Sequence, residues 1–310
     1  MGNTDISVNT LPDANTENTT EHSTIFDDVF RTIAQKMPQL LIPLINEVFH
    51  TSYSEKEPFE QLRNEHYEKF GTVVTDSIIR IGSHIYHLEC QSTKDETMVI
   101  RMFEYDLAIA LESRRRVGRR FFVEFPRSCV IYLRTTKNTP DVEEVELKLP
   151  DGQVCVYRVP TVKVENYTKD SIFEKKLLML LPFYIMRYEK SADIIEKDSE
   201  KLQRLLSEYE DIRNKLGKEI SISGRSELYT DLNRLIIRIS DYVFRNKEKV
   251  RKGVGEVMGG KVLQLESERL REEGMAIGKA EGKAEGEARL SALINRLFLE
   301  GRSDEVQRVV

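Results

Sequence analysis

The sequence lacks a long apolar run, is poor in cysteine and contains none of the short motifs that mark several large enzyme classes. Its most apolar segment, 177–185, is interrupted by Pro182 and is far shorter than the roughly 20 residues of a membrane span, so it predicts a buried helix and no membrane association. Its three cysteines lack the CxxC or Cys/His spacing of zinc sites, which is typical of a cytoplasmic protein. The absence of a Gly-rich phosphate loop, an HExxH sequence or a nucleophile elbow argues against NTPases, zinc proteases and serine hydrolases.

Composition and charge are those of an ordinary globular protein. Of its 310 residues, 40% are apolar and 32% are charged, which allows one sizeable domain and a smaller second one. Because the formal net charge is -5, any nucleic-acid binding must depend on a local basic cluster. Residues 1–22 are rich in Asn, Thr and Asp and lack the basic start and apolar segment of a signal peptide, so we expect a disordered leader.

Hydrophobic periodicity predicts an α/β domain over 23–165. Apolar residues at three- and four-residue spacing in 25–49 predict interrupted helices, and alternation in 72–91 predicts a β-hairpin. A mixed sheet flanked by helices accounts for this order of elements. The further signals are a helix at 98–111, a central strand at 128–133, and strands at 153–159 and 161–164.

The rest of the chain is predicted to be helical, as an appendage over 166–250 and a charged helical tail over 251–310. Periodic apolar residues occur in 172–187, 192–216 and 228–244. In the tail, glycine and alanine recur every four residues, either as a packing stripe that would support a homo-oligomer through the C-terminal helices or as a flexible charged extension. The glycines are Gly274, Gly278, Gly282 and Gly286.

The hairpin carries the residues of greatest chemical interest. A two-residue loop at Gly82 and Ser83 pairs residues whose numbers sum to 165, so Asp76 should face Glu89. Alternation places both carboxylates on one face, while Ile79, Leu88 and their alternates form the opposite, core face. Carboxylates about 5 Å apart across a ladder repel each other. A divalent cation such as Mg²⁺ would offset this repulsion, and a solvent-facing pair without function is the alternative.

The hairpin pattern resembles the Asp…Glu-x-Gln variant of the PD-(D/E)XK nuclease core. The sequence carries it as Thr75-Asp76-Ser77-Ile78-Ile79, a turn, and His87-Leu88-Glu89-Cys90-Gln91. More closely, the chain resembles the Rpn-like recombination-promoting nucleases, a family also labelled as transposases. The resemblance covers roughly residues 25–290 and includes the segments 26–31, 101–105, 172–177 and 181–184 together with the Glu/Gly/Lys/Ala tail.

This resemblance implies a PD-(D/E)XK-like α/β core and a metal-dependent DNA endonuclease. It makes Asp76 and Glu89 metal ligands, with the Cys90 main-chain carbonyl as a third, for Mg²⁺ or alternatively Mn²⁺. Gln91 would stand where most of the superfamily has lysine, and a neutral amide could only orient the attacking water. The superfamily also has an acidic residue on its first helix, for which we choose Glu47, with Glu65 as the alternative.

Basic and aromatic residues after the hairpin are candidates for DNA binding. Arg101 and Tyr105, four residues apart on the predicted helix, would share one face and contact phosphate; an exposed arginine over a packed tyrosine is the alternative. His84 and His87 lack metal-ligand spacing, so we assign them surface roles or internally satisfied ones. A basic stretch at the end of that helix could hold a phosphate backbone or form a solvated helix end; it contains Arg114, Arg115, Arg116, Arg119 and Arg120.

Overall fold

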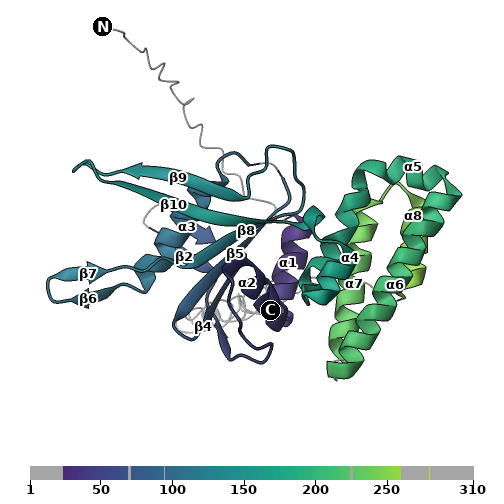
Figure 1. Cartoon of the computed structure of the whole chain (residues 1–310), viewed down its shortest axis with the longest axis horizontal. Coiled ribbons are helices and arrows are strands. Elements are labelled where there is room, and N and C mark those ends of the chain that lie inside the picture. The colour runs from purple at the N-terminus through teal and green to yellow at the C-terminus, as the bar shows by residue number, and fades with distance from the viewer. Residues whose placement is uncertain (1–23, 69–70, 94, 224–225, 260–278, 280–310) are drawn as a thin grey trace, which may run out of the picture.

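A mixed six-stranded sheet forms the centre of the structure, a computed structural model that describes residues 24–68, 71–93, 95–223, 226–259 and 279 (Figure 1). Strand pairing is parallel from β5 to β8 and from β8 to β10, and antiparallel elsewhere in this sheet. In spatial order the strands are β1 (Phe59–Gln61), β4 (Ser77–Ile81), β5 (His84–Gln91), β8 (Arg127–Tyr132), β10 (Val154–Lys163) and β9 (Val142–Lys148).

Two short antiparallel ribbons accompany the main sheet. The first consists of β2 (Glu65–Glu68) and β3 (Gly71–Val74), which directly precede β4. The second consists of β6 (Arg115–Val117) and β7 (Arg120–Phe122) and projects away from the body of the molecule (Figure 1). The described elements therefore form a central sheet with two small lateral hairpins.

Helices cover both faces of the sheet, giving three layers. In the larger hydrophobic core, one face of the hairpin packs against α1 (Ile25–Lys36) and α2 (Leu41–Phe49), which are connected by a short 3-10 helix, η1 (Pro38–Leu40). The hairpin residues on this face are Ile79, Ile81, Tyr86, Leu88 and Cys90. The opposite face packs against α3 (Met98–Glu112), where Met98 and Met102 contact Val130, Tyr132 and Val159. Both faces of the acidic hairpin are thus covered.

The C-terminal helices extend the larger core without a break. Residues of α6 and α7 belong to the same buried cluster as α1 and the sheet, and α7 contacts both α1 and η3. Within the described residues, no helix is long and apolar enough to cross a membrane. The elements are η2 (Val164–Asn166), α4 (Lys169–Glu174), η3 (Leu178–Ser191), α5 (Ala192–Lys197), α6 (Ser199–Ser223), α7 (Ser226–Val243) and α8 (Glu248–Met258).

Several predictions of secondary structure are confirmed. The sheet is mixed and flanked by helices, the helix predicted at 98–111 is α3, and the strand predicted at 128–133 is the central strand β8. The register of β4 with β5 pairs residues whose numbers sum to 165, from Ser77 with Leu88 to Ile81 with His84. Gly82 has a φ of 57°, which a tight hairpin turn of the primed types requires.

Other predictions of secondary structure were wrong. The single helix expected at 172–187 is α4 followed by the 3-10 helix η3, because Lys176 adopts a left-handed φ of 57° and Pro182 lies inside the next segment. The two strands expected at 153–164 are one strand, β10. The leader and most of the Gly/Ala tail lie outside the described residues, in the segments 1–22, 260–278 and 280–310. The four tail glycines are among them: Gly274, Gly278, Gly282 and Gly286. The boundary expected at residue 250 falls inside α8.

Candidate functional site at the ends of β4 and β5

Asp76 and Glu89 lie beside each other where β4 begins and β5 ends. Asp76 directly precedes β4, and its main-chain N–H donates a 3.1 Å hydrogen bond to Glu89 Oε2. In return, the main-chain N–H of Cys90 donates a 2.9 Å hydrogen bond to Asp76 Oδ2. Both residues are only 4% exposed. Each carboxylate is therefore held by the main chain of the other strand, in the pairing that the hairpin register predicts.

Cationic groups surround this acidic pair. From α1, Arg31 Nε donates a 3.1 Å hydrogen bond to Asp76 Oδ1, and from α3, Arg101 Nη2 lies 3.7 Å from Glu89 Oε1. Burial, followed by the charge of Glu89, still raises the pKa of Asp76 well above its usual range, although Arg31 and the Cys90 amide oppose the shift. The two arginines therefore do not fully compensate the burial of the acidic pair, and an additional positive charge would stabilise it.

A buried histidine connects Glu89 to helix α3. His87 is fully buried, with Nδ1 2.7 Å from Asp106 Oδ1 on α3 and Nε2 3.3 Å from Glu89 Oε2. The Tyr157 hydroxyl on β10 donates a 2.5 Å hydrogen bond to the other oxygen of Asp106. Burial lowers the pKa of His87, but the bonds to Asp106 and Glu89 outweigh it and raise the pKa to about 10. The buried imidazole is therefore held between two carboxyl groups that both favour its protonated form, in keeping with the internally satisfied role expected for it.

Arg101 and Tyr105 share one face of α3, as their four-residue spacing predicts. Arg101 Nη1 forms a 2.9 Å ion pair with Asp95, and Nε donates a weak 3.4 Å hydrogen bond to the Tyr105 hydroxyl. The Tyr105 ring centroid lies 6.1 Å from that of His87. The Arg101 side chain is half-buried and lies between the acidic pair and solvent.

Gln91 and Cys90 occupy different surroundings. The Gln91 amide donates to the main-chain oxygen of Thr93 at 3.0 Å and to its hydroxyl at 3.2 Å, and within the described residues no hydrogen bond joins it to the acidic pair. The Cys90 side chain is buried in the larger core, where burial raises its thiol pKa. Its main-chain carbonyl is the group of interest, because the N–H and C=O of one strand residue face the same neighbouring strand. Since the Cys90 N–H faces Asp76, so does its carbonyl.

The structure does not bring the proposed first-helix acid to the pair. Glu47, on α2, forms a 2.6 Å ion pair with Lys175, and no contact within the described residues joins it to Asp76 or Glu89. Glu65 lies on β2, where it pairs with Val74. Instead Asp27, at the start of α1, is close enough to interact electrostatically with both Arg31 and Glu89, and burial raises its pKa.

Two residues near the pair, Asp27 and Asp106, are not among those that the sequence predicts. Asp27 forms a capping box with Thr24, which explains its position without any functional role, so its second role could not be read from the sequence. Asp106 follows Met102 by four residues and therefore lies on the apolar side of the predicted helix, where a charged residue needs a buried partner. That signal could have identified the partner of His87.

The five clustered arginines do not end a helix, contrary to the sequence prediction. α3 ends at Glu112, and Arg115, Arg116 and Arg120 lie on the β6–β7 ribbon. The reason is that Gly118, with a φ of 61°, makes a turn between β-forming residues, which are Val117, Phe121 and Phe122. Arg114 and Arg119 lie in the flanking loop and the turn.

The acidic pair and its surroundings can supply only part of the coordination shell of a magnesium ion. Within the described ranges, no group of three or more His, Cys, Asp or Glu side chains is arranged to hold a metal. Mg²⁺ commonly takes one or two carboxylates and completes its shell with water and substrate phosphate oxygens. Asp76, Glu89 and the Cys90 carbonyl can supply such a partial set, and the raised pKa of Asp76 marks a location where a cation would be stabilising.

Comparisons of the chain with protein-family models, with curated proteins and with solved structures give no match. The class of protein that the fold and the site define is therefore an α/β protein with a mixed sheet and a buried acidic pair bordered by arginines.

Proposed function

We propose that the chain is a metal-dependent DNA endonuclease with a PD-(D/E)XK-like core, acting in recombination or on mobile elements. The observation that carries the proposal is the pairing of two buried carboxylates, Asp76 and Glu89, at the open end of the β4–β5 hairpin. This pair lies between two arginines that come from different helices. The sequence resemblance to Rpn-like nucleases supports the same assignment. Carboxylates for a cation and guanidinium groups for phosphate are the components that phosphodiester hydrolysis needs.

Asp76, Glu89 and the Cys90 carbonyl would hold the cation. When bound, Mg²⁺ or Mn²⁺ would polarise the scissile phosphate and lower the pKa of a water molecule. The chain's own groups would do the rest. Glu89 is oriented by His87 and by the Asp76 N–H. Asp27 of α1, which interacts electrostatically with Glu89, would take the place proposed for Glu47. Gln91 could orient water only after leaving Thr93.

Arg31 and Arg101 would then bind phosphate. Both currently lie against the acidic pair, and a cation between the carboxylates would weaken the attraction that holds them there. The side chains are 31% exposed for Arg31 and 29% exposed for Arg101, so each can reach a substrate at the surface. A guanidinium can bind two phosphate oxygens at once, which would position the backbone for attack.

One observation favours a second candidate, a catalytically silent nuclease fold that acts as a DNA-binding or oligomerising adaptor. Arg31 and His87 already neutralise much of the charge of the pair, and the amide of Gln91 is engaged by Thr93. A protein of this kind would bind DNA with or without a divalent cation.

The two candidates are separated by incubating the purified full-length protein with supercoiled plasmid in Mg²⁺, in Mn²⁺ and in EDTA. Nicking or linearisation that requires a divalent cation supports the endonuclease. Retarded migration of intact plasmid under all three conditions contradicts the endonuclease and supports the adaptor.

Replacing Arg115, Arg116 and Arg119 together with Ala should weaken DNA binding uniformly across sequences. Arginines that bind phosphates release counterions, so the slope of log K against log salt should become shallower by about 1 for each phosphate that is no longer bound. Fluorescence anisotropy at several salt concentrations measures this slope. A matched triple variant of exposed basic residues on the helical part, Lys190, Lys201 and Arg204, should keep the wild-type slope. An unchanged slope in the hairpin variant would exclude these arginines from the DNA interface.

A further inference from the structure

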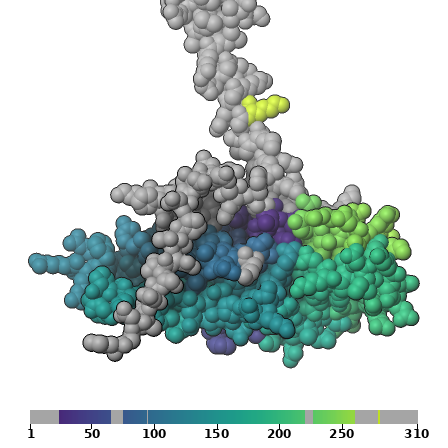
Figure 2. All heavy atoms as spheres, turned by 90° about the horizontal axis from the view of Figure 1, so that it is seen from above, coloured from purple at the N-terminus to yellow at the C-terminus, as the bar shows by residue number. Residues whose placement is uncertain are grey.

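The β6–β7 hairpin exposes large apolar side chains to solvent. Phe121 is 65% exposed, Val117 is 63% exposed and Phe122 is 46% exposed. Figure 2 shows the hairpin standing out at one end of the molecule, away from the body. A projecting ribbon with exposed aromatic rings buries little surface of its own, so its apolar residues indicate a surface for binding.

The pairing of the two strands combines aromatic rings with cations on both faces of the ribbon. Arg115 pairs with Phe122 and Arg116 with Phe121, so each face carries an arginine beside a phenylalanine, and Arg120 adds a second arginine to the Phe122 face. The Arg115 guanidinium lies 4.4 Å from the centroid of the Phe122 ring. Within the described residues, no carboxylate pairs with any of the five arginines from 114 to 120. Their charge is therefore available to an anionic partner.

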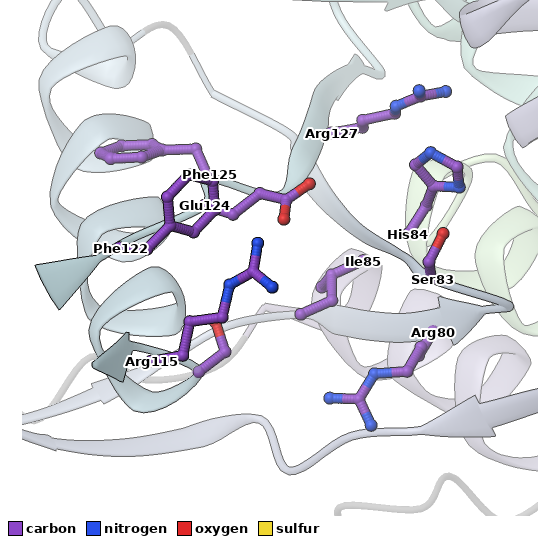
Figure 3. A pocket seen from close by; sticks show the side chains of 10 residues that line it. Arg80, Ser83, His84, Ile85, Arg115, Phe122, Glu124, Phe125 and Arg127 are labelled. Atoms are coloured by element: carbon purple, nitrogen blue, oxygen red, sulfur yellow. The ribbon is translucent and has the colours of Figure 1, made fainter. Parts of the chain in front are cut away.

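A hollow lies where this hairpin meets the β4–β5 turn. Its volume is about 290 Å³, close to the lower end of the range for small-ligand sites, roughly 300 Å³. Arg80, Arg115 and Arg127 line it together with Phe122 and Phe125 (Figure 3). Its one acidic side chain is Glu124, and Arg80 is additionally paired with Glu60 at 2.6 Å, so the lining keeps an excess of positive charge.

The hollow and Glu89 of the acidic pair belong to the same face of the hairpin. Arg80 and Ile85 alternate in register with His87 and Glu89, so these four point toward the side covered by α3. His84, which lines the hollow, precedes Glu89 by five residues, or about 17 Å along an extended strand. A polymer that reaches both sites would have to pass over α3, because His87, which lies between them on the same face, is buried against Asp106 of that helix.

We propose that the β6–β7 hairpin and this hollow bind unpaired nucleotides of single-stranded DNA, an inference that rests on the proposed action on DNA. Phe121 and Phe122 would stack on exposed bases, one base would enter the hollow against Phe125, and the arginines would hold the flanking phosphates. The rings are the deciding feature, because bases in a duplex are stacked on one another and offer their faces to no side chain. Phosphate contacts alone would need only the arginines. The proposed substrate is thus DNA with a single-stranded gap, overhang or unpaired loop.

The test measures binding of full-length protein to fluorescently labelled single-stranded DNA, blunt duplex DNA and single-stranded RNA of equal length, in EDTA. The double variant Phe121→Ala/Phe122→Ala should bind single-stranded DNA about ten- to a hundredfold more weakly, and duplex DNA within about threefold of wild type. The variant Phe121→Tyr/Phe122→Tyr keeps the rings and should keep the affinity. Ile194→Ala, at another exposed apolar position that is 53% accessible, is the matched control and should change neither affinity.

Three results would overturn the proposal: equal losses for single-stranded and duplex DNA, no loss in the alanine double variant, or tighter binding of RNA than of DNA. Because these side chains are exposed, the melting temperatures of all variants should match that of the wild type. The outcome is separable from that of the plasmid assay. Ring-dependent binding of single strands without cleavage of either plasmid or gapped duplex DNA in Mg²⁺ sustains this inference and contradicts the endonuclease. Cleavage with ring-independent binding does the reverse.

Discussion

Replacing Asp76 with Asn is expected to reduce Mg²⁺-dependent cleavage of plasmid DNA on the order of a thousandfold. The substitution removes one of two anionic ligands with little change in shape, and the cation's contribution to the reaction is worth several kcal/mol. The stabilisation of the folded protein by Mg²⁺ should shrink as well, because it follows from binding to the folded state alone. Nicking rates and melting temperatures with and without Mg²⁺ measure the two effects.

The same substitution should affect stability in the opposite direction when no metal is present. Burial and the charge of Glu89 raise the pKa of Asp76, so the folded state binds a proton more tightly than the unfolded state does. The stability of the wild type should therefore fall as the pH rises above about 4, the usual aspartate pKa, and stay lower above the raised value. An asparagine side chain at this position cannot ionise. At pH 7 in EDTA the variant should be as stable as the wild type or more stable, by roughly 0.2–1 kcal/mol.

Two further variants sharpen this test. Glu89→Gln should behave like Asp76→Asn in cleavage, since it removes the other member of the pair. Asp141→Asn is the matched control, because the Asp141 side chain is 89% exposed and, among the described residues, forms an ion pair with Lys163 alone. It should leave cleavage and Mg²⁺-dependent stabilisation unchanged. If both site variants are less stable than wild type in EDTA and still cleave DNA in Mg²⁺, then Asp76 and Glu89 are structural and the proposed nuclease function is wrong.

The geometry of the acidic pair could be predicted because it depends on local rules. A two-residue turn at Gly82 fixes which residues oppose one another, and alternation fixes which of them share a face. The buried strand 128–133 could be predicted for a similar reason, because a continuous apolar run of that length suits a strand covered on both sides. None of these inferences needs information about residues far away in the sequence.

The partners of the pair could not be predicted, because they come from distant elements. Arg31 lies 45 residues before Asp76, and Tyr157 lies 51 residues after Asp106. Only the packing of α1, α3 and β10 against the sheet brings these groups together. The sequence pattern predicts that a bound cation offsets the repulsion between the two carboxylates. In the structure, side chains of the protein also approach the pair with basic groups, namely Arg31, Arg101 and His87. The β6–β7 hairpin is different, because its signal is local: a glycine turn at Gly118 between β-forming residues, masked by the density of arginines around it.

The buried cation His87 should make the stability of the protein depend on pH in the alkaline range. Its folded pKa of about 10 lies above the usual histidine value, near 6.5. Its stabilising contribution is therefore fully present below about pH 6.5 and is lost as the pH rises toward 10. Urea unfolding of the wild type across this interval should show a loss of a few kcal/mol. His87→Ala leaves Asp106 and Glu89 without their shared cation and should cost about 3–5 kcal/mol at pH 7.

The double variant His87→Gln/Asp106→Asn keeps the question answerable if His87→Ala does not fold. It replaces the charged pair with two neutral amides of similar size, so it should fold and lose most of the wild-type pH dependence between 6.5 and 10. His84→Gln, on the same strand but partly exposed, should retain that dependence and is the matched control. The chain of contacts from Tyr157 through Asp106 and His87 to Glu89 places both ring nitrogens of His87 against carboxyl groups, an arrangement that favours a protonated imidazole. A wild-type stability that stays flat from pH 6.5 to 10 would mean that His87 is neutral in the folded protein over this interval.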